Sequence, residues 1–198
     1  MSRQQAIASV HETLDSGALF DTLARRIAIA SESQDPGRAA ELERYLRDEM
    51  IPSFEAMGFS CRVLEHPKAL APFLVAERFE DAALPTVLGY GHGDVIRGLE
   101  PQWRAGLNPW RLHEEGDRLY GRGTADNKGQ HTINLGALQS VLAVRGKLGF
   151  NVKLLIETGE EIGIKRLEAR PVATLTIEAQ ERRERRERQY GDRDDRYR

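Results

Sequence analysis

The sequence predicts an α/β domain with a largely parallel sheet. Apolar, strand-like runs alternate with amphipathic helical segments, and residues 150–156 form a compact apolar run of the kind found in buried parallel strands. Strand–helix–strand order of this type places parallel strands side by side with helices packed over them. At 198 residues the chain is long enough for one domain with its own hydrophobic core.

The N-terminal half is expected to begin with helices and to continue with strands. Apolar residues recur at helical spacing over roughly residues 4–15 and 18–30, and again from about Gly37, so we predict two short helices and a longer one. Pro52 should kink the longer helix or end it early. Strands are predicted at residues 60–64, 73–79 and 86–90.

The C-terminal half is expected to contain a loop, a short strand, a helix and the buried strand. Residues 98–110 are rich in Gly, Trp and Pro and should form a structured loop. Residues 117–121 are expected to form a short strand. A helix is predicted near residues 128–144, because its apolar residues recur on one side.

The composition excludes several classes of protein. The chain has 29 Lys and Arg against 31 Asp and Glu, so we expect no basic surface for nucleic acid. A single cysteine, Cys61, excludes an internal disulfide and a CxxC metal or redox site. The first residues lack the apolar core of a signal peptide, and no run approaches the ~18 apolar residues of a membrane span. We therefore expect a soluble, cytoplasmic protein with no membrane partner.

The first candidate site follows the predicted strand 86–90, where residues 89–94 read GYGHGD. His92 could bind a metal through one ring nitrogen, and Asp94 could accept a hydrogen bond from the other. The alternative is a Gly-rich turn that holds an ordinary hydrogen-bonded histidine. A dinucleotide site is not favoured, because the third glycine of a GxGxxG pattern would fall at Asp94.

Two further acidic clusters stand where predicted elements begin or end. Asp126 precedes the predicted helix and either caps it or bridges two metal ions through its two oxygens. Lys128, in the first helical turn, is unfavourable for the helix dipole. Glu160 and Glu161 follow the strand at 150–156 and form either a solvated acidic turn or a metal ligand beside a proton acceptor. Strand ends are where open α/β sheets place their sites.

In this order, the motifs resemble the M20 family of metallopeptidases, which includes glutamate carboxypeptidase-like, acetylornithine deacetylase-like and succinyl-diaminopimelate desuccinylase-like enzymes. The matching segments are GHGDV at 91–95, YGRGTADNKGQ at 120–130 and ETGEEIG at 157–163. Trp103 and the NPW step at 108–110 match the loop between the first two motifs, and the resemblance covers about residues 10–163. Asn127 departs from the family, which commonly has a second Asp there. The resemblance implies a cis peptide bond between Asp126 and Asn127.

The resemblance implies a three-layer αβα unit of the zinc-exopeptidase type, with a mostly parallel sheet. It implies hydrolysis of a peptide or N-acyl amide bond in a small peptide or N-acyl amino acid substrate. Two Zn²⁺ ions, or Co²⁺ or Mn²⁺ in their place, would be held by His92 on one side, Glu161 on the other and Asp126 bridging both. Glu160 would be the general base, and Asp94 would assist catalysis by orienting His92.

The resemblance stops after Gly163. The family needs a further Asp and a distal His as ligands, but the first Asp after Glu161 is Asp192, and no His follows His131. We expect residues 1–163 to be the N-terminal part of an M20-type catalytic domain. Residues 164–198 are expected to be an unrelated, charged tail, disordered or helical, that arises from a frameshift, a truncation or a misjoined reading frame.

These departures lead to an expectation about activity. The lid domain and the family dimer interface would be absent, and the chain alone would be an inactive hydrolase. The alternative is a non-catalytic fragment or binding module with an Arg-rich tail, since fourteen of the eighteen residues at 181–198 are charged.

Overall fold

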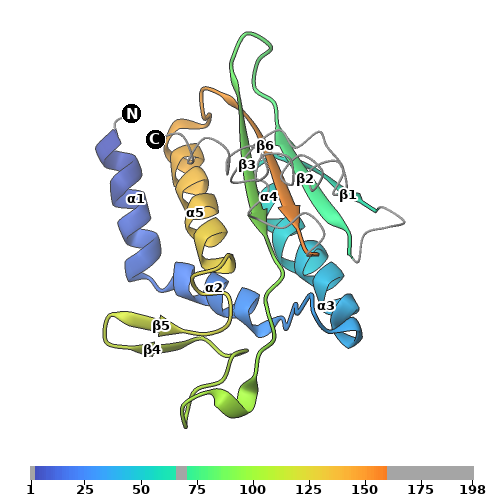
Figure 1. Cartoon of the computed structure of the whole chain (residues 1–198). Coiled ribbons are helices and arrows are strands. Elements are labelled where there is room, and N and C mark those ends of the chain that lie inside the picture. The colour runs from blue at the N-terminus through green and yellow to red at the C-terminus, as the bar shows by residue number, and fades with distance from the viewer. Residues whose placement is uncertain (1–2, 66–70, 160–198) are drawn as a thin grey trace, which may run out of the picture. The chain divides into compact units, whose positions relative to one another are not determined.

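The structure is a computed structural model that describes residues 3–65 and 71–159, and Figure 1 shows how its elements are arranged. The main sheet of the described residues has the strand order β1-β2-β6-β3. These strands are β1 (Ser60–Leu64), β2 (Phe73–Arg78), β3 (Thr86–His92) and β6 (Asn151–Glu157). Together with the helices around them they confirm the predicted α/β class.

The described sheet is mixed, which corrects the expectation of a mostly parallel one. β1 pairs with β2 and β2 pairs with β6 in antiparallel fashion, and β3 alone runs parallel to β6. Only eight residues separate Leu64 from Phe73, whereas a parallel crossover needs a dozen or more. The connection from β3 to β6 is long enough, because it includes α5 (Lys128–Arg145).

Helices precede the sheet as predicted, with one local difference. α1 (Arg3–Asp15) and α2 (Ala18–Ala28) are followed by the 3-10 turn η1 (Pro36–Arg38). The predicted longer helix consists of α3 (Ala39–Arg44), the π-helical η2 (Tyr45–Met50) and α4 (Ile51–Glu55).

Pro52 does not end this helix. The backbone N–H of Ile51 bonds to the carbonyl of Leu46, five residues back, so the helix widens into a π turn directly before the proline. A widened turn accommodates a residue that cannot donate to the carbonyl four positions earlier.

The main core lies between one face of the sheet and the helices. Leu74 of β2 and Ile156 of β6 face it and are almost completely buried. The helical side contributes Ile29, Tyr45, Leu46, Met50, Phe54 and Leu135. On the opposite face Glu77 forms ion pairs with Lys153 at 2.6 Å and Arg62 at 3.0 Å. The described residues thus show one helical layer, and the second layer of the predicted three-layer unit is not among them.

The segment between β3 and α5 is a structured loop, as predicted. It contains the 3-10 turn η3 (Glu100–Gln102) and a hairpin of β4 (His113–Glu115) and β5 (Arg118–Tyr120). β5 corresponds to the strand predicted at 117–121. β4 was not predicted, because three residues of mixed polarity give no readable period. Trp103 fixes the loop by donating from Nε1 to the Gly98 carbonyl at 2.7 Å.

The chain divides into two units, Met1–Glu161 and Ile162–Arg198. The second unit, and with it the predicted tail at 164–198, lies outside the described residues. Within the described part, no helix is both long and apolar enough to span a bilayer.

Candidate metal centre

Two of the predicted ligands meet at one edge of the sheet. His92 is the last residue of β3, and Asp126 lies in the turn before α5. Although 34 positions apart in the sequence, their Nε2 and Oδ1 atoms are 3.0 Å from each other. The His92 side chain is 9% exposed and that of Asp126 is 78% exposed. The pair therefore combines a buried imidazole with a carboxylate that is open to the outside.

Asp94 holds the other nitrogen of the same imidazole. His92 Nδ1 lies 3.0 Å from the backbone carbonyl of Asp94 and 3.2 Å from its Oδ1. Burial lowers the pKa of His92, but hydrogen bonds and charges from Asp94 and Asp126 more than offset it and raise the pKa to about 8. Acceptors at both ring nitrogens favour the doubly protonated ring, which donates from Nδ1 to Asp94 and from Nε2 to Asp126 Oδ1.

The turn between β5 and α5 orients Asp126. The Asp126–Asn127 peptide bond is cis, as the resemblance implied. The N-cap of α5 is Asn127 and not Asp126, so the alternative role of Asp126 as the helix cap is wrong. Asn127 Oδ1 accepts a hydrogen bond from the backbone N–H of His92 at 3.2 Å. This contact ties the start of α5 to the end of β3.

Lys128 lies directly behind this turn and is completely buried. Its Nζ donates to the carbonyls of Arg26 at 3.0 Å and Ile29 at 2.7 Å, and it lies 4.8 Å from the centre of the Tyr45 ring. Burial lowers its pKa to about 7. The residue that looked unfavourable for its own helix dipole thus interacts with the carbonyls at the C-terminal end of α2, where a cation is favourable.

A buried carboxylate that the sequence analysis gave no role lies beside His92. Glu157 ends β6 opposite His92 in the parallel register and is 7% exposed. The hydroxyl of Tyr90 donates to its Oε1. Burial raises the pKa of Glu157 to about 7. Glu157 is the first glutamate of the ETGEEIG motif and stands at the end of a buried strand. These two features could have identified it as a site residue from the sequence.

Glu160 and Glu161, the other two predicted site residues, lie outside the described residues. Within 3–65 and 71–159, no cluster of three or more His, Cys, Asp or Glu side chains could hold a metal ion. The two donors that do meet are of the types zinc prefers. An imidazole whose second nitrogen is held by Asp94 also matches the usual environment of a metal-binding histidine. The described half of the site therefore fits a metal.

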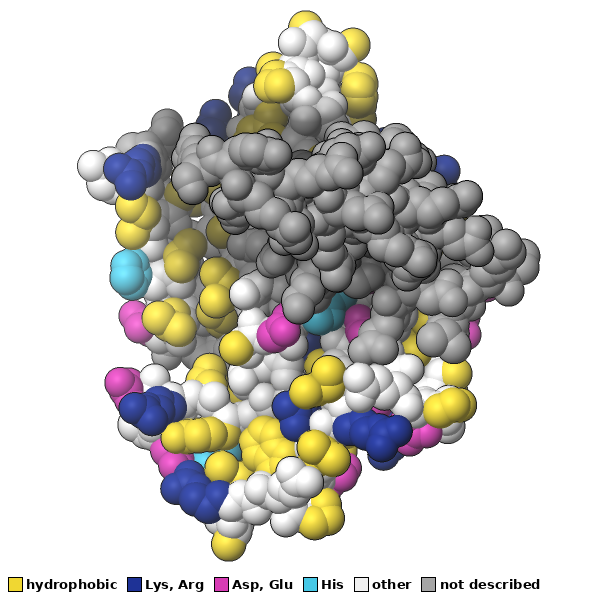
Figure 2. Space-filling model, in the orientation of Figure 1, with side chains coloured by type: hydrophobic (Ala, Val, Ile, Leu, Met, Phe, Trp, Pro, Cys, Tyr) yellow, Lys and Arg dark blue, Asp and Glu magenta, His cyan; other side chains and the backbone are white. Residues whose placement is uncertain are grey.

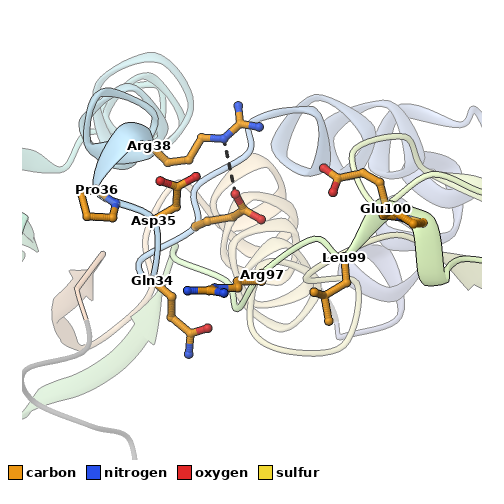
Figure 3. Close-up of a pocket in the computed structure, with 9 residues that line it drawn as sticks. Gln34, Asp35, Pro36, Arg38, Arg97, Leu99 and Glu100 are labelled. Atoms are coloured by element: carbon orange, nitrogen blue, oxygen red, sulfur yellow. Dashed lines mark ion pairs between the residues drawn. The ribbon is translucent and has the colours of Figure 1, made fainter.

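A cavity of about 490 Å³ lies along the segment that follows β3. Arg38 and Glu32 line it and form an ion pair at 3.4 Å, and the dashed line at Arg38 in Figure 3 marks this pair. Glu32 also accepts a hydrogen bond from the backbone N–H of Gly98 at 2.5 Å. No candidate ligand is among the residues that line this cavity, so it is distinct from the His92–Asp126 pair.

Comparison with known proteins decides the family. The model described as "Peptidase family M20/M25/M40" matches residues 88–189, which is just over half of the chain. The chain belongs to peptidase family M20. The match contains His92, Asp94 and Asp126 and extends past Glu160 and Glu161.

The relatives of this M20 chain include dipeptidases. It is 37% identical to the Beta-Ala-His dipeptidase of Mus musculus over 100 residues, which is 50% of this chain and 20% of that protein. The crystal structure of human carnosine dipeptidase 1 superposes with a TM-score of 0.73 and 27% identity, covering 84% of this chain and 36% of that one. The M20 chain therefore spans about a fifth of the mouse relative's length and about a third of the human one's.

A further comparison gives a relative of a different kind. Over 36 residues the M20 chain is 69% identical to the RNA polymerase-binding transcription factor DksA of Caulobacter vibrioides. The match covers 18% of this chain and 25% of that protein. The sequence is therefore similar to a dipeptidase and, over a short stretch, to a transcription factor.

Proposed function

We propose that this chain carries part of a metal-dependent peptidase centre that hydrolyses the peptide bond of a small, dipeptide-like substrate. The observation that supports it most is the approach of His92 Nε2 to Asp126 Oδ1, at 3.0 Å, on the edge where β3 ends. The M20 membership and the similarity to a Beta-Ala-His dipeptidase support the reaction and the substrate class. Activity and substrate belong to the whole protein, of which this chain spans a part.

Each residue of the proposed centre has a distinct role. His92 would bind one metal ion through Nε2, Asp126 would bridge to the second, and Glu161 would hold the second. When Nε2 gives up its proton to bind the metal, Asp94 would keep the other proton of His92 on Nδ1. Glu160 would accept the proton of the attacking water at its carboxylate and return it to the leaving amine.

The metal ions would be Zn²⁺, or Co²⁺ or Mn²⁺ in place of Zn²⁺. They would lower the pKa of a bound water and polarise the scissile carbonyl. The open Asp126 carboxylate has room for contacts beyond His92, since 78% of its side chain is exposed. Glu160 and Glu161 would have separate roles: the Glu161 carboxylate would bind a metal ion, and the Glu160 carboxylate would transfer the proton.

Zinc titration of the purified chain tests this assignment. We expect His92→Ala and Asp126→Ala each to weaken binding at least about tenfold, because each removes a direct ligand. His113→Ala in β4 is the matched control and should bind zinc as the wild type does. Equal affinity in all three variants would contradict the proposed centre.

A second candidate function concerns the C-terminal residues. We infer that the DksA match lies toward the C-terminus, because residues 164–198 are the part of the chain that follows the last M20 motif. By that likeness the stretch would bind RNA polymerase, which favours a binding role over catalysis. The M20 match also extends into this stretch, to residue 189.

An interaction experiment distinguishes these assignments. The immobilised full chain should retain purified bacterial RNA polymerase, and a variant that ends at residue 162 should not. If the full chain retains none, or if the shortened variant retains as much, the second candidate is rejected.

A further inference from the structure

We propose that His131 is a positioning residue for the metal centre: it holds the side-chain oxygen of Asn127, which in turn fixes the backbone of His92. The inference rests on the function proposed above. His131 lies on α5, is 3% exposed and has no place among the candidate ligands. Its Nε2 contacts the hydroxyl of Tyr45, and its Nδ1 lies 3.3 Å from Asn127 Oδ1.

The orientation of the Asn127 amide follows from its other partners. Its Nδ2 donates to Gln130 Oε1 at 2.5 Å, and its Oδ1 accepts from the backbone N–H of His92 at 3.2 Å. Turning the amide over would place its NH₂ group against the N–H of His92, two donors face to face. The oxygen therefore faces both His92 and His131.

This orientation decides the tautomer of His131. A ring nitrogen that faces an amide oxygen has to carry the proton, so Nδ1 is the donor and Nε2 the acceptor. Tyr45 then donates its hydroxyl proton to Nε2. Burial, together with the nearby charges of Arg26 and Lys128, lowers the pKa of His131 well below its usual value, which keeps the ring neutral.

The contact between Asn127 and His131 lies close to β3. A Cβ atom at Gly91 would lie 3.0 Å from Asn127 Oδ1 and 3.4 Å from His131 Nδ1. A side chain at this position would require the Asn127 amide to shift by a few tenths of an ångström. Glycine at position 91 therefore lets the amide oxygen lie close to the strand that ends at His92.

The network links the residues that carry the two ligands. Asn127 directly follows Asp126 in the chain, and its oxygen holds the N–H of His92. His131, itself held by Tyr45, thus sets how the end of β3 lies against the start of α5. A purely structural role would lower stability and leave the metal affinity unchanged, so the two roles are separable.

Two substitutions of His131 separate the roles of its nitrogens. His131→Asn places an amide nitrogen near the position of Nδ1, and His131→Gln places one near that of Nε2. Both keep a neutral, polar side chain in a buried position. Thr132→Val is the matched control: Thr132 is buried on the same helix and accepts a hydrogen bond from Arg26 at 2.6 Å.

Co²⁺ titration, followed by visible absorption, measures the effect on the metal. We expect His131→Asn to stay within about twofold of wild-type affinity and His131→Gln to lose about tenfold, the size of effect seen for outer-shell partners. Thr132→Val should melt at a lower temperature and bind Co²⁺ normally. Equal Co²⁺ affinity in His131→Asn and His131→Gln would overturn the inference.

NMR of the metal-free chain tests the inference independently of the proposed function. In the wild type, the His131 ring should be the Nδ1–H tautomer. The backbone amide proton of His92 should keep its downfield shift in His131→Asn and lose it in His131→Gln. If the wild type binds no Co²⁺, the proposed function fails, and the amide shift still decides the inference. An unchanged His92 shift in His131→Gln refutes the positioning role.

Discussion

Lys128 shows, at the scale of single residues, how a side chain that looks misplaced in the sequence is explained by distant neighbours. Its charge opposes the dipole of its own helix, but its ammonium bonds to two carbonyls at the end of α2. Those carbonyls are about 100 positions away in the sequence. Local propensity cannot reveal a partner at that separation, so the sequence could flag the residue but could not explain it.

Removing the Lys128 ammonium should destabilise the fold. In Lys128→Met the carbonyls of Arg26 and Ile29 lose their buried donor, which should lower the free energy of unfolding by about 1–3 kcal/mol. Urea unfolding measures this change. Lys147→Met, at an exposed lysine, is the control and should change stability by less than about 0.5 kcal/mol. Equal effects in the two variants would show that the buried contacts do not stabilise the fold.

Glu157 should make the stability of the metal-free chain depend on pH. Its pKa is raised to about 7 by burial, so between about pH 4.5 and 7 the folded chain binds a proton that the unfolded chain has released. The free energy of unfolding therefore falls as the pH rises through this window. Glu157→Gln should abolish this part of the slope in urea titrations at pH 5 and pH 7, and Glu114→Gln, at an exposed carboxylate, should retain it. An unchanged slope in Glu157→Gln would contradict the assignment.

At the scale of elements, the two glycines of α5 should respond in opposite ways to the same change. A Cβ at Gly129 would collide with the backbone oxygen of Thr124, whereas one at Gly136 would lie 3.4 Å from Leu19 Cδ1. Gly129→Ala should destabilise the fold by about 2 kcal/mol or more, because backbone has to move. Gly136→Ala should be neutral or stabilise the helix by up to about 1 kcal/mol. Thermal melting compares them, and a stabilised Gly129→Ala would refute the turn geometry.

The sequence predicted the elements well where the apolar period was long. The two N-terminal helices, the helix at α5 and the strands that became β1, β2 and β6 were placed within about two residues of their positions. β3 runs two residues further than predicted, to His92, because glycines hide the strand pattern there. The π turn before Pro52 and the short strand β4 leave no periodic signal. Strand direction was misjudged because it depends on the connections and not on the strands themselves.

The candidate site was predicted in part. Strand-end placement and motif order pointed to His92, Asp94 and Asp126, and the structure brings these three side chains together. The contacts of His131 with Tyr45 and Asn127 could not be predicted. A buried histidine on a helix and a buried tyrosine read as core residues until the helix and the strand are placed against each other.

At the scale of the whole molecule, part of the surface of the described residues is apolar. Figure 2 shows hydrophobic side chains at the tip formed by the β2–β3 connection, where Phe79 is 72% exposed. Val87 and Leu88 of β3 are 48% and 56% exposed. β3 is also one of the two edge strands of the described sheet. Exposed apolar residues on an edge strand favour association.

We expect the 198-residue chain to show no appreciable peptidase turnover, even with zinc supplied. Catalytic zinc sites normally use three protein ligands and a water, and the centre proposed above assigns two protein groups to each metal. The measurement is hydrolysis of β-alanyl-histidine and other dipeptides with excess zinc, followed by chromatography. Turnover that disappears in Glu160→Ala would show that the ligands present are sufficient.

The parallel pairing of β3 with β6 also determines when the centre forms as the chain folds. Residues 93–150 separate these two strands, whereas eight residues separate β1 from β2. The entropy lost in closing a loop grows with its length, and pairings between distant segments form slowly. We therefore expect the β1–β2 and β4–β5 hairpins to form early and the edge with His92 and Glu157 to be completed late, once α5 has docked. A newly synthesised chain would already contain its hairpins while the side chains proposed to bind the metal are still far apart.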